Sequence, residues 1–177
     1  HTGANFPIDR GVILSSGAAT ASTGPNNIDA FTGSEGTGPA WAGDADIKTI
    51  LDNRFGDDQV TNNATIVEFD FIPLTTDFSF EYLFASEEYM VFNYECSTFQ
   101  DGFAFIISGP GITNDPGLTG KNIALLADGV TPVSVGTIHN NTAQCPPAQN
   151  PGLYENYYTA DGTGVAATAP IQYNGRT

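Results

Sequence analysis

The sequence predicts an all-β protein, a β-sandwich with long loops and one short helix. Three observations favour this class. First, 20 Gly and 11 Pro among 177 residues are too many for a helical bundle. Second, apolar and polar residues alternate along residues 65–72 and 78–84, the period of a strand with one buried face. Third, the length is close to the roughly 150 residues expected of one domain, and 40% apolar residues suffice for a core. We therefore expect a single domain over residues 1–177.

The first half of the chain predicts loops, one short strand and the helix. Residues 12–14 form an apolar run that ends in a turn, and a long loop follows over residues 17–43. Asp44 can cap a helix over residues 45–55, in which apolar residues recur at three- and four-residue spacing. Gly56 stops this helix.

Strands dominate the second half. Residues 65–72 and 78–84 predict a hairpin-like pair, and residues 103–108 predict a central strand buried on both faces. Three more strands are expected, at 122–127, 132–138 and 171–173. Seven or so short strands separated by turns are typical of a β-sandwich.

The charge excludes several classes of partner. Twenty acidic and five basic side chains give a net charge of −15. Nucleic acids and anionic membranes require a basic surface, so neither is expected as a partner. There is no apolar run of 18 residues, so we expect no membrane insertion. The chain begins at His1, as a mature or excised fragment would. The acidity suits divalent cations, for which carboxylates are hard ligands.

Two cysteines, Cys96 and Cys145, would form a disulfide in an oxidising compartment and stay free in the cytosol. Few lysines and many Thr, Asn and Gly residues favour an extracellular place, and with it the disulfide. The alternative is that Cys96 acts with His139 and Asn140 in a cysteine-protease-like triad.

The densest acidic feature lies between two apolar strands. It comprises Glu87, Glu88, Glu95 and Asp101. Like charges on one loop repel each other, and calcium, which takes six to eight oxygen ligands, relieves that repulsion. The alternative is a solvated acidic loop. Asp44 and Asp46 form a second candidate, for which the alternative is the start of a helix, where acidic residues favour the helix dipole.

Catalysis finds little support, so we expect no enzyme. Glu68 and Asp70 share a strand face as in sandwich-fold glycosidases, but Ile72 stands where a third carboxylate would be wanted, so the pattern favours a solvated outer face of an edge sheet. There is no nucleophile elbow and no phosphate loop. Tyrosines in the loops, Tyr89 and Tyr94 among them, suit a binding surface or ordinary packing.

Several blocks together resemble the choice-of-anchor L domain of bacterial secreted and surface proteins. The central blocks are residues 84–89 (FASEEY), 101–111 (DGFAFIISGPG), 122–125 (NIAL) and 132–135 (PVSV). Residues 11–17, 43–47 and 172–175 fit the same pattern. The resemblance implies further strands after the last of these blocks, whereas the chain ends at Thr177, which leaves one sheet edge in question.

Some of these domains look like the peptide-binding domain of calcium-dependent RTX adhesins. The resemblance therefore implies calcium dependence, a place outside the cell on the bacterial surface, and a ligand-binding role. The partner would be a peptide or protein on another cell surface. The domain itself would be a monomeric module within a larger chain.

The acidic residues and the resemblance together predict a calcium-ordered cleft. Its expected calcium ligands are Asp44, Asp46, Glu87, Glu88 and Asp101, and its expected ligand-binding residues are Tyr89, Asn93, Tyr94 and Asn140. Calcium would order these long loops and leave one coordination position open for a ligand carboxylate. Two alternatives stay open: a structural spacer that binds calcium without a ligand, and a lectin or glycosidase-like domain.

Overall fold

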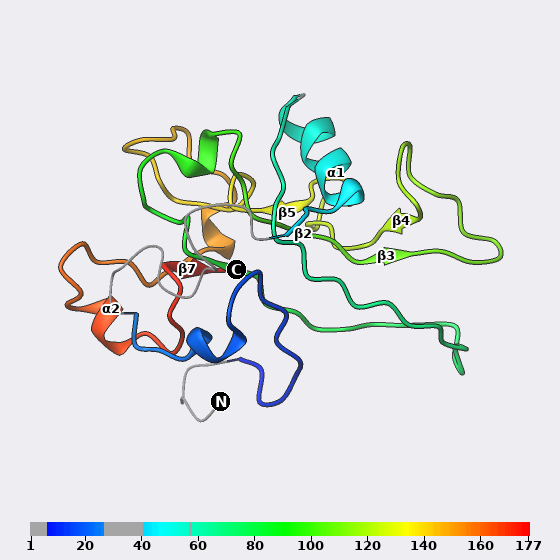
Figure 1. Ribbon diagram of the computed structural model, residues 1–177, viewed down its shortest axis with the longest axis horizontal. Coiled ribbons are helices and arrows are strands. Elements are labelled where there is room, and N and C mark those ends of the chain that lie inside the picture. The colour runs from blue at the N-terminus through cyan, green and yellow to red at the C-terminus, as the bar shows by residue number, and fades with distance from the viewer. Residues whose placement is uncertain (1–6, 27–40, 57) are drawn as a thin grey trace.

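The structure, a computed structural model, describes residues 7–26, 41–56 and 58–177. Most of the loop predicted over residues 17–43 lies outside these residues. Within them, strands are short and helices few, which confirms the mostly β character (Figure 1). No described helix has the length and apolar character needed to cross a bilayer.

The described strands form three small antiparallel sheets. In the first, β7 (Gly175–Arg176) lies between β1 (Ala85–Ser86) and β6 (Glu155–Asn156). In the second, β2 (Gly102–Phe103) pairs with β5 (Val133–Ser134). In the third, β3 (Ile106–Ile107) pairs with β4 (Lys121–Asn122). These ladders are too short to establish two packed layers, so the sandwich stays a prediction.

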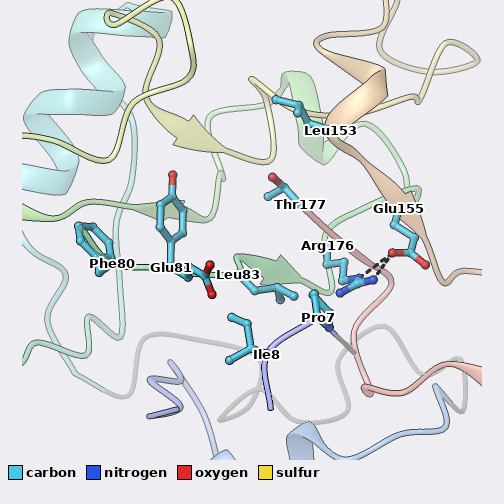
Figure 2. Close-up of a pocket in the computed structure, with 10 residues that line it drawn as sticks. Pro7, Ile8, Phe80, Glu81, Leu83, Leu153, Glu155, Arg176 and Thr177 are labelled. Carbon is cyan, nitrogen blue, oxygen red and sulfur yellow. Dashed lines mark hydrogen bonds and ion pairs between the residues drawn. The ribbon is translucent and has the colours of Figure 1, made fainter. Parts of the chain in front are cut away.

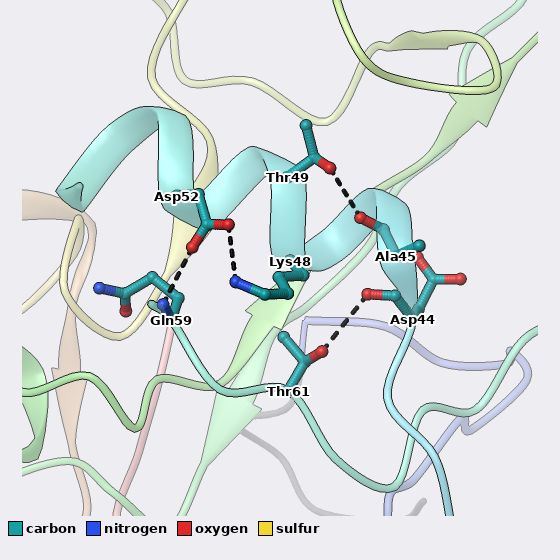
Figure 3. A network of polar contacts seen from close by, with 7 residues as sticks. All are labelled: Asp44, Ala45, Lys48, Thr49, Asp52, Gln59 and Thr61. Carbon is teal, nitrogen blue, oxygen red and sulfur yellow. Dashed lines mark hydrogen bonds and ion pairs between the residues drawn. The ribbon is translucent and has the colours of Figure 1, made fainter. Parts of the chain in front are cut away.

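The predicted helix is confirmed at both ends. Helix α1 spans Ala45–Phe55, and the Asp44 carboxylate accepts a hydrogen bond from the backbone N–H of Ile47 at 2.9 Å. Gly56 ends it with a φ of +98°, a conformation that favours glycine. Figure 3 shows how Asp52 joins the helix to the following segment: it accepts from Lys48 and from the backbone N–H of Gln59.

The described residues contain four further helical turns. η1 (Ala19–Ser22) precedes all the strands, whereas η2 (Tyr94–Cys96), η3 (Pro151–Leu153) and α2 (Val165–Thr168) lie between strands.

The main core cluster lies around the segment that leaves β1. Its buried members are Phe84, Tyr89, Val133, Val135 and Ile138, with Phe103, Leu126 and Tyr154 packed against them. A second cluster is built from Tyr157, Ala169 and Ile171. The first cluster fixes the position of the acidic residues that follow β1, because its member Tyr89 comes directly after Glu87 and Glu88 in the chain.

Residues 65–83 form an extended arm that projects from the rest of the chain (Figure 1). Alternation predicts a paired hairpin here, but no backbone hydrogen bond between its two legs occurs in the described structure. Residues 65–79 are all exposed. The predicted strand at 12–14 is likewise exposed, with Val12 85% exposed, and it pairs with no strand among the described residues. A strand needs a partner as well as an alternating pattern, and within the described ranges these segments have none.

Candidate functional site

Three carboxylates on the connection between β1 and β2 form what we call the acidic centre: Glu88, Glu95 and Asp101. Ser86, the last residue of β1, organises two of them. Its hydroxyl donates to the Asp101 carboxylate at 2.6 Å and accepts from the backbone N–H of Glu88 at 3.0 Å. The Glu88 carboxylate in turn accepts from the backbone N–H of Asp101 at 3.0 Å. Glu88 and Asp101, thirteen positions apart, are thereby held against each other.

Burial destabilises the charged form of both Glu88 and Asp101. Burial raises the pKa of Glu88 to about 9, and the negative charges of Asp101 and Glu95 add to that rise. Burial also raises the pKa of Asp101, against the opposing effect of the hydrogen bond from Ser86. The salt bridges among described residues, Lys48 with Asp52 and Arg176 with Glu155, involve other carboxylates. The acidic centre therefore lacks the cation that would stabilise its ionised form.

Glu95 is the deepest of the three, with 1% of its surface exposed. Its carboxylate accepts from the backbone N–H of Met90 at 2.6 Å and from the Asn141 amide at 2.9 Å. Buried His139 lies close enough that the charge of Glu95 opposes the lowering of its pKa by burial. The sequence did not place Glu95, because nothing in local periodicity separates a buried glutamate from an exposed one.

The disulfide between Cys96 and Cys145 is confirmed, with the two Cα atoms 5.5 Å apart. It joins the residue after Glu95 to the segment that carries Asn141, whose carbonyl accepts from the backbone N–H of Cys145 at 3.1 Å. The disulfide thus holds together the two segments that carry Glu95 and Asn141. It also argues against the protease-like triad, because a disulfide sulfur is not a nucleophile.

Tyr89 contributes an unsatisfied oxygen to the acidic centre. Its side chain is fully buried, its ring centroid lies 4.8 Å from that of Tyr154, and its hydroxyl has no hydrogen-bond partner in the described structure. Burial raises the pKa of this hydroxyl well above its ordinary value, and Tyr154, Asp101, Glu95 and Glu88 add to that rise. Buried hydroxyls are normally paired, so an oxygen beside three carboxylates suits a bound cation.

The loop above the acidic centre exposes an aromatic pair. Phe92 is 61% exposed, and its ring meets that of Tyr94 edge-on with centroids 5.8 Å apart. Met90 and Phe92 have φ values of 63° and 52°, which are unusual for bulky residues and mark a strained backbone. Asn141 holds this loop too, since its amide donates to the carbonyl of Phe92 at 3.2 Å.

The predicted ligand-binding residues have different environments. Asn93 and Asn140 are exposed and Tyr94 is partly exposed, so all three can reach a ligand. Tyr89, in contrast, lies inside the core. Phe92 is an exposed aromatic residue of the same loop that was not among the predicted ligand-binding residues, although it lies between Tyr89 and Tyr94 in the sequence.

The five predicted calcium ligands do not gather at one point. Asp44 caps α1, and Asp46 accepts from both the backbone N–H and the hydroxyl of Thr119. Glu87, the residue before Glu88 in the sequence, is buried. In the parts of the chain that the structure describes, no three His, Cys, Asp or Glu side chains form a ready-made metal site. What the structure does bring together is Glu88 and Asp101, with Glu95 near them.

A cavity of about 570 Å³ lies elsewhere, between residues 80–83 and the C-terminal strand (Figure 2). Its walls include Ile8, Leu83 and Leu153, and Arg176 is paired with Glu155 at its rim. The glycosidase alternative needs two carboxylates free to act on one bond. Of the two that line this cavity, Glu81 and Glu155, the second is already engaged by Arg176.

Comparison with known proteins gives one match. The family model of the choice-of-anchor L domain matches residues 1–177. No curated protein and no solved structure matches the chain.

Proposed function

The chain belongs to the choice-of-anchor L domain family, and we propose that it is a calcium-dependent adhesion module that binds a peptide or protein ligand. Membership of the family makes it a bacterial surface-associated module, secreted or on the cell surface, of a non-enzymatic kind. The calcium dependence and the ligand are the proposed part.

The observation that carries the proposal is the contact between Glu88 and Asp101. Two carboxyl groups are held together by Ser86 and by the backbone; burial raises the pKa of both, and the charge of Asp101 raises that of Glu88 further. A divalent cation reverses this cost, because it favours the ionised form of each group. Calcium suits the contact between Glu88 and Asp101 better than zinc, since two carboxylates and the Tyr89 hydroxyl offer oxygen ligands.

Calcium bound between Glu88 and Asp101 would restrict the exposed loop, because both residues belong to the segment that forms it. Glu88 and Asp101 mark the two ends of the segment that carries Phe92 and Tyr94. Glu95 fixes its middle through Met90 and Asn141. Fixing both ends lowers the entropy that the loop loses when a ligand binds, and thus raises affinity. Calcium keeps water ligands readily, so a peptide carboxylate can replace one of them.

The proposal is tested with an array of random peptides without Lys or Arg that carry either a free or an amidated C-terminus. We expect binding in 2 mM calcium, its loss in EDTA, and weaker binding of the amidated forms. Equal binding in calcium and EDTA contradicts the calcium mechanism. If no peptide binds in either condition while calcium still raises the melting temperature, the module is a structural spacer.

Replacing Phe92 with asparagine tests the aromatic loop. Asparagine accepts the left-handed backbone conformation at this position, so Phe92→Asn removes the ring with little cost to folding. We expect at least tenfold weaker peptide binding and unchanged calcium affinity. Phe99→Asn, at a second residue that is 55% exposed, is the matched control. Equal losses in both variants would contradict a specific role for Phe92.

A further inference from the structure

The arm over residues 65–83 has an unpaired backbone. In the described structure no backbone N–H or C=O of residues 66–83 is bonded to another backbone group. The contact recorded for this backbone is the carbonyl of Asp77, which accepts from the Thr75 hydroxyl at 2.7 Å. Extended, solvent-facing backbone of this kind is a template for an added strand.

One face of the arm is a continuous row of aromatic rings. Centroids lie 6.0 Å apart for Phe69 and Phe71, 5.1 Å for Phe71 and Phe78, and 6.0 Å for Phe78 and Phe80. The row continues to Phe105, just before β3, at 4.1 Å from Phe80. Phe69, Phe71 and Phe78 are 60%, 40% and 49% exposed. An apolar row of this length, left in water, indicates an interaction surface.

The acidic residues of the arm restrict what can bind there. Glu68, Asp70, Asp77 and Glu81 lie on it and no basic residue does, so the arm carries a charge of −4. Glu68 and Asp70 alternate with the apolar residues Val67, Phe69 and Phe71, which places the two carboxylates on the opposite face of an extended strand. A strand added at this edge would present its own alternate side chains to each face.

We propose that the arm binds an extended peptide strand in which basic and apolar residues alternate. Its apolar side chains lengthen the aromatic row, and its basic side chains stand opposite Glu68 and Asp70, as favourable cross-strand pairs do. A second copy of this chain is a poorer occupant, because it would bring like charges face to face. This surface is separate from the acidic centre, so its binding does not need calcium.

The test uses a fluorescein-labelled ten-residue peptide of alternating Lys and Val, with anisotropy measured against the whole chain in EDTA. A block peptide with five Lys followed by five Val has the same charge and composition without the alternation. We expect the alternating peptide to bind at least tenfold more tightly than the block peptide, and an alternating Glu–Val peptide not to bind. Equal affinity for the alternating and block peptides would reduce the interaction to net charge and overturn the proposal.

Reversing the charge of two acidic residues of the arm tests the proposal more sharply than changing the peptide. In Glu68→Lys/Asp70→Lys the preference should invert, with at least tenfold weaker binding of the Lys–Val peptide and new binding of the Glu–Val peptide. Asp9→Lys/Asp161→Lys makes the same charge change at exposed residues outside the arm and should leave the preference intact. The single Glu81→Lys is the second variant if the double variant misfolds. Unaltered preference in the arm variants, or dimerisation through the arm in sedimentation analysis, overturns the proposal. Because calcium is absent throughout, failure here leaves the proposed adhesion function untouched.

Discussion

Glu88 is the residue whose environment most strongly requires explanation. A carboxyl group with a pKa of about 9 is neutral at pH 7 when no cation is bound. Keeping it neutral costs free energy, because the unfolded chain has released that proton. A calcium ion turns the same burial into an advantage, because it pairs with the ionised form. The contribution of the Glu88 carboxyl group to the free energy of unfolding should therefore change sign: it destabilises the calcium-free protein and stabilises the calcium-bound protein.

The substitution Glu88→Gln should have opposite effects in the two conditions. Glutamine keeps an acceptor for the backbone N–H of Asp101 and removes the charge. In EDTA at pH 7 we expect the variant to be more stable by roughly 1–3 kcal/mol, the scale of an uncompensated buried polar group. In calcium at about 1,000 times its dissociation constant, the wild type gains about 4.1 kcal/mol and the variant gains little, which reverses the order of stability.

Urea unfolding with and without calcium measures both effects. Glu81→Gln, at an exposed glutamate of the arm, is the control and should change neither value. A Glu88→Gln variant that is less stable in both conditions would mean that Glu88 serves packing alone.

At the scale of elements, the helix was the part of the fold that local sequence determines. A cap, apolar spacing and a terminal glycine all lie within thirteen residues, and α1 forms where they predict it. The strands were harder, because their pairing joins distant residues. The predicted strand 103–108 overlaps β2 only at Phe103 and contains β3 as a separate two-residue strand, and β7 at Gly175–Arg176 follows the predicted 171–173. Alternation predicts an extended backbone but cannot say what pairs with it.

In the candidate site, too, local sequence predicted the residues that lie close together in the chain and missed the contacts between distant ones. Clustering in the sequence was enough to pick out Glu88 and Asp101, since they flank one connection. The contact of Glu95 with Asn141 spans 46 positions and carries no local signal. Asp44 and Asp46, predicted as calcium ligands, lie at the start of α1 with contacts of their own.

The disulfide is the element that should hold the acidic centre in shape. Cys96 and Cys145 are 49 positions apart, and closing a loop of that length stabilises the folded state by about 4 kcal/mol in the chain-entropy treatment. We expect Cys96→Ser/Cys145→Ser to lose stability of that order. We also expect calcium affinity to fall several-fold, because Glu95 and Asn141 lose the link that joins their segments.

Denaturant unfolding gives the first quantity and calorimetry of calcium binding the second. Because the pairing of Asp44 with α1 does not involve this link, Asp44→Ala is the control: it should cost about 1 kcal/mol as a lost helix cap and leave calcium affinity unchanged. A disulfide-free variant with full calcium affinity would contradict the positioning role.

At the scale of the whole molecule, the protein has a net charge of −15, and its free energy of unfolding changes with pH through buried groups whose pKa values are shifted. Without calcium, Glu88 has a pKa of about 9 in the folded state against an ordinary value of 4.5. Between these values the folded protein holds a proton that the unfolded chain has lost, so stability falls as pH rises from about 4.5 to about 9. His139 acts in the opposite direction below pH 6.5, because burial lowers its pKa.

Melting temperatures from pH 5 to pH 8.5 in EDTA test this behaviour. The difference between wild type and Glu88→Gln isolates the contribution of Glu88, since His139 is common to both. We expect the variant's advantage to grow steadily with pH in EDTA and to be reversed by calcium. A difference that stays constant over the range would mean that the carboxyl group of Glu88 titrates normally.

The most direct test of the account is a crystal grown in calcium, with anomalous scattering used to locate the ion. The account predicts one peak between Glu88 and Asp101, with oxygen ligands at about 2.3–2.6 Å. Peaks confined to exposed acidic residues, with the Glu88 and Asp101 side chains hydrogen-bonded to each other and no ion between them, would contradict it.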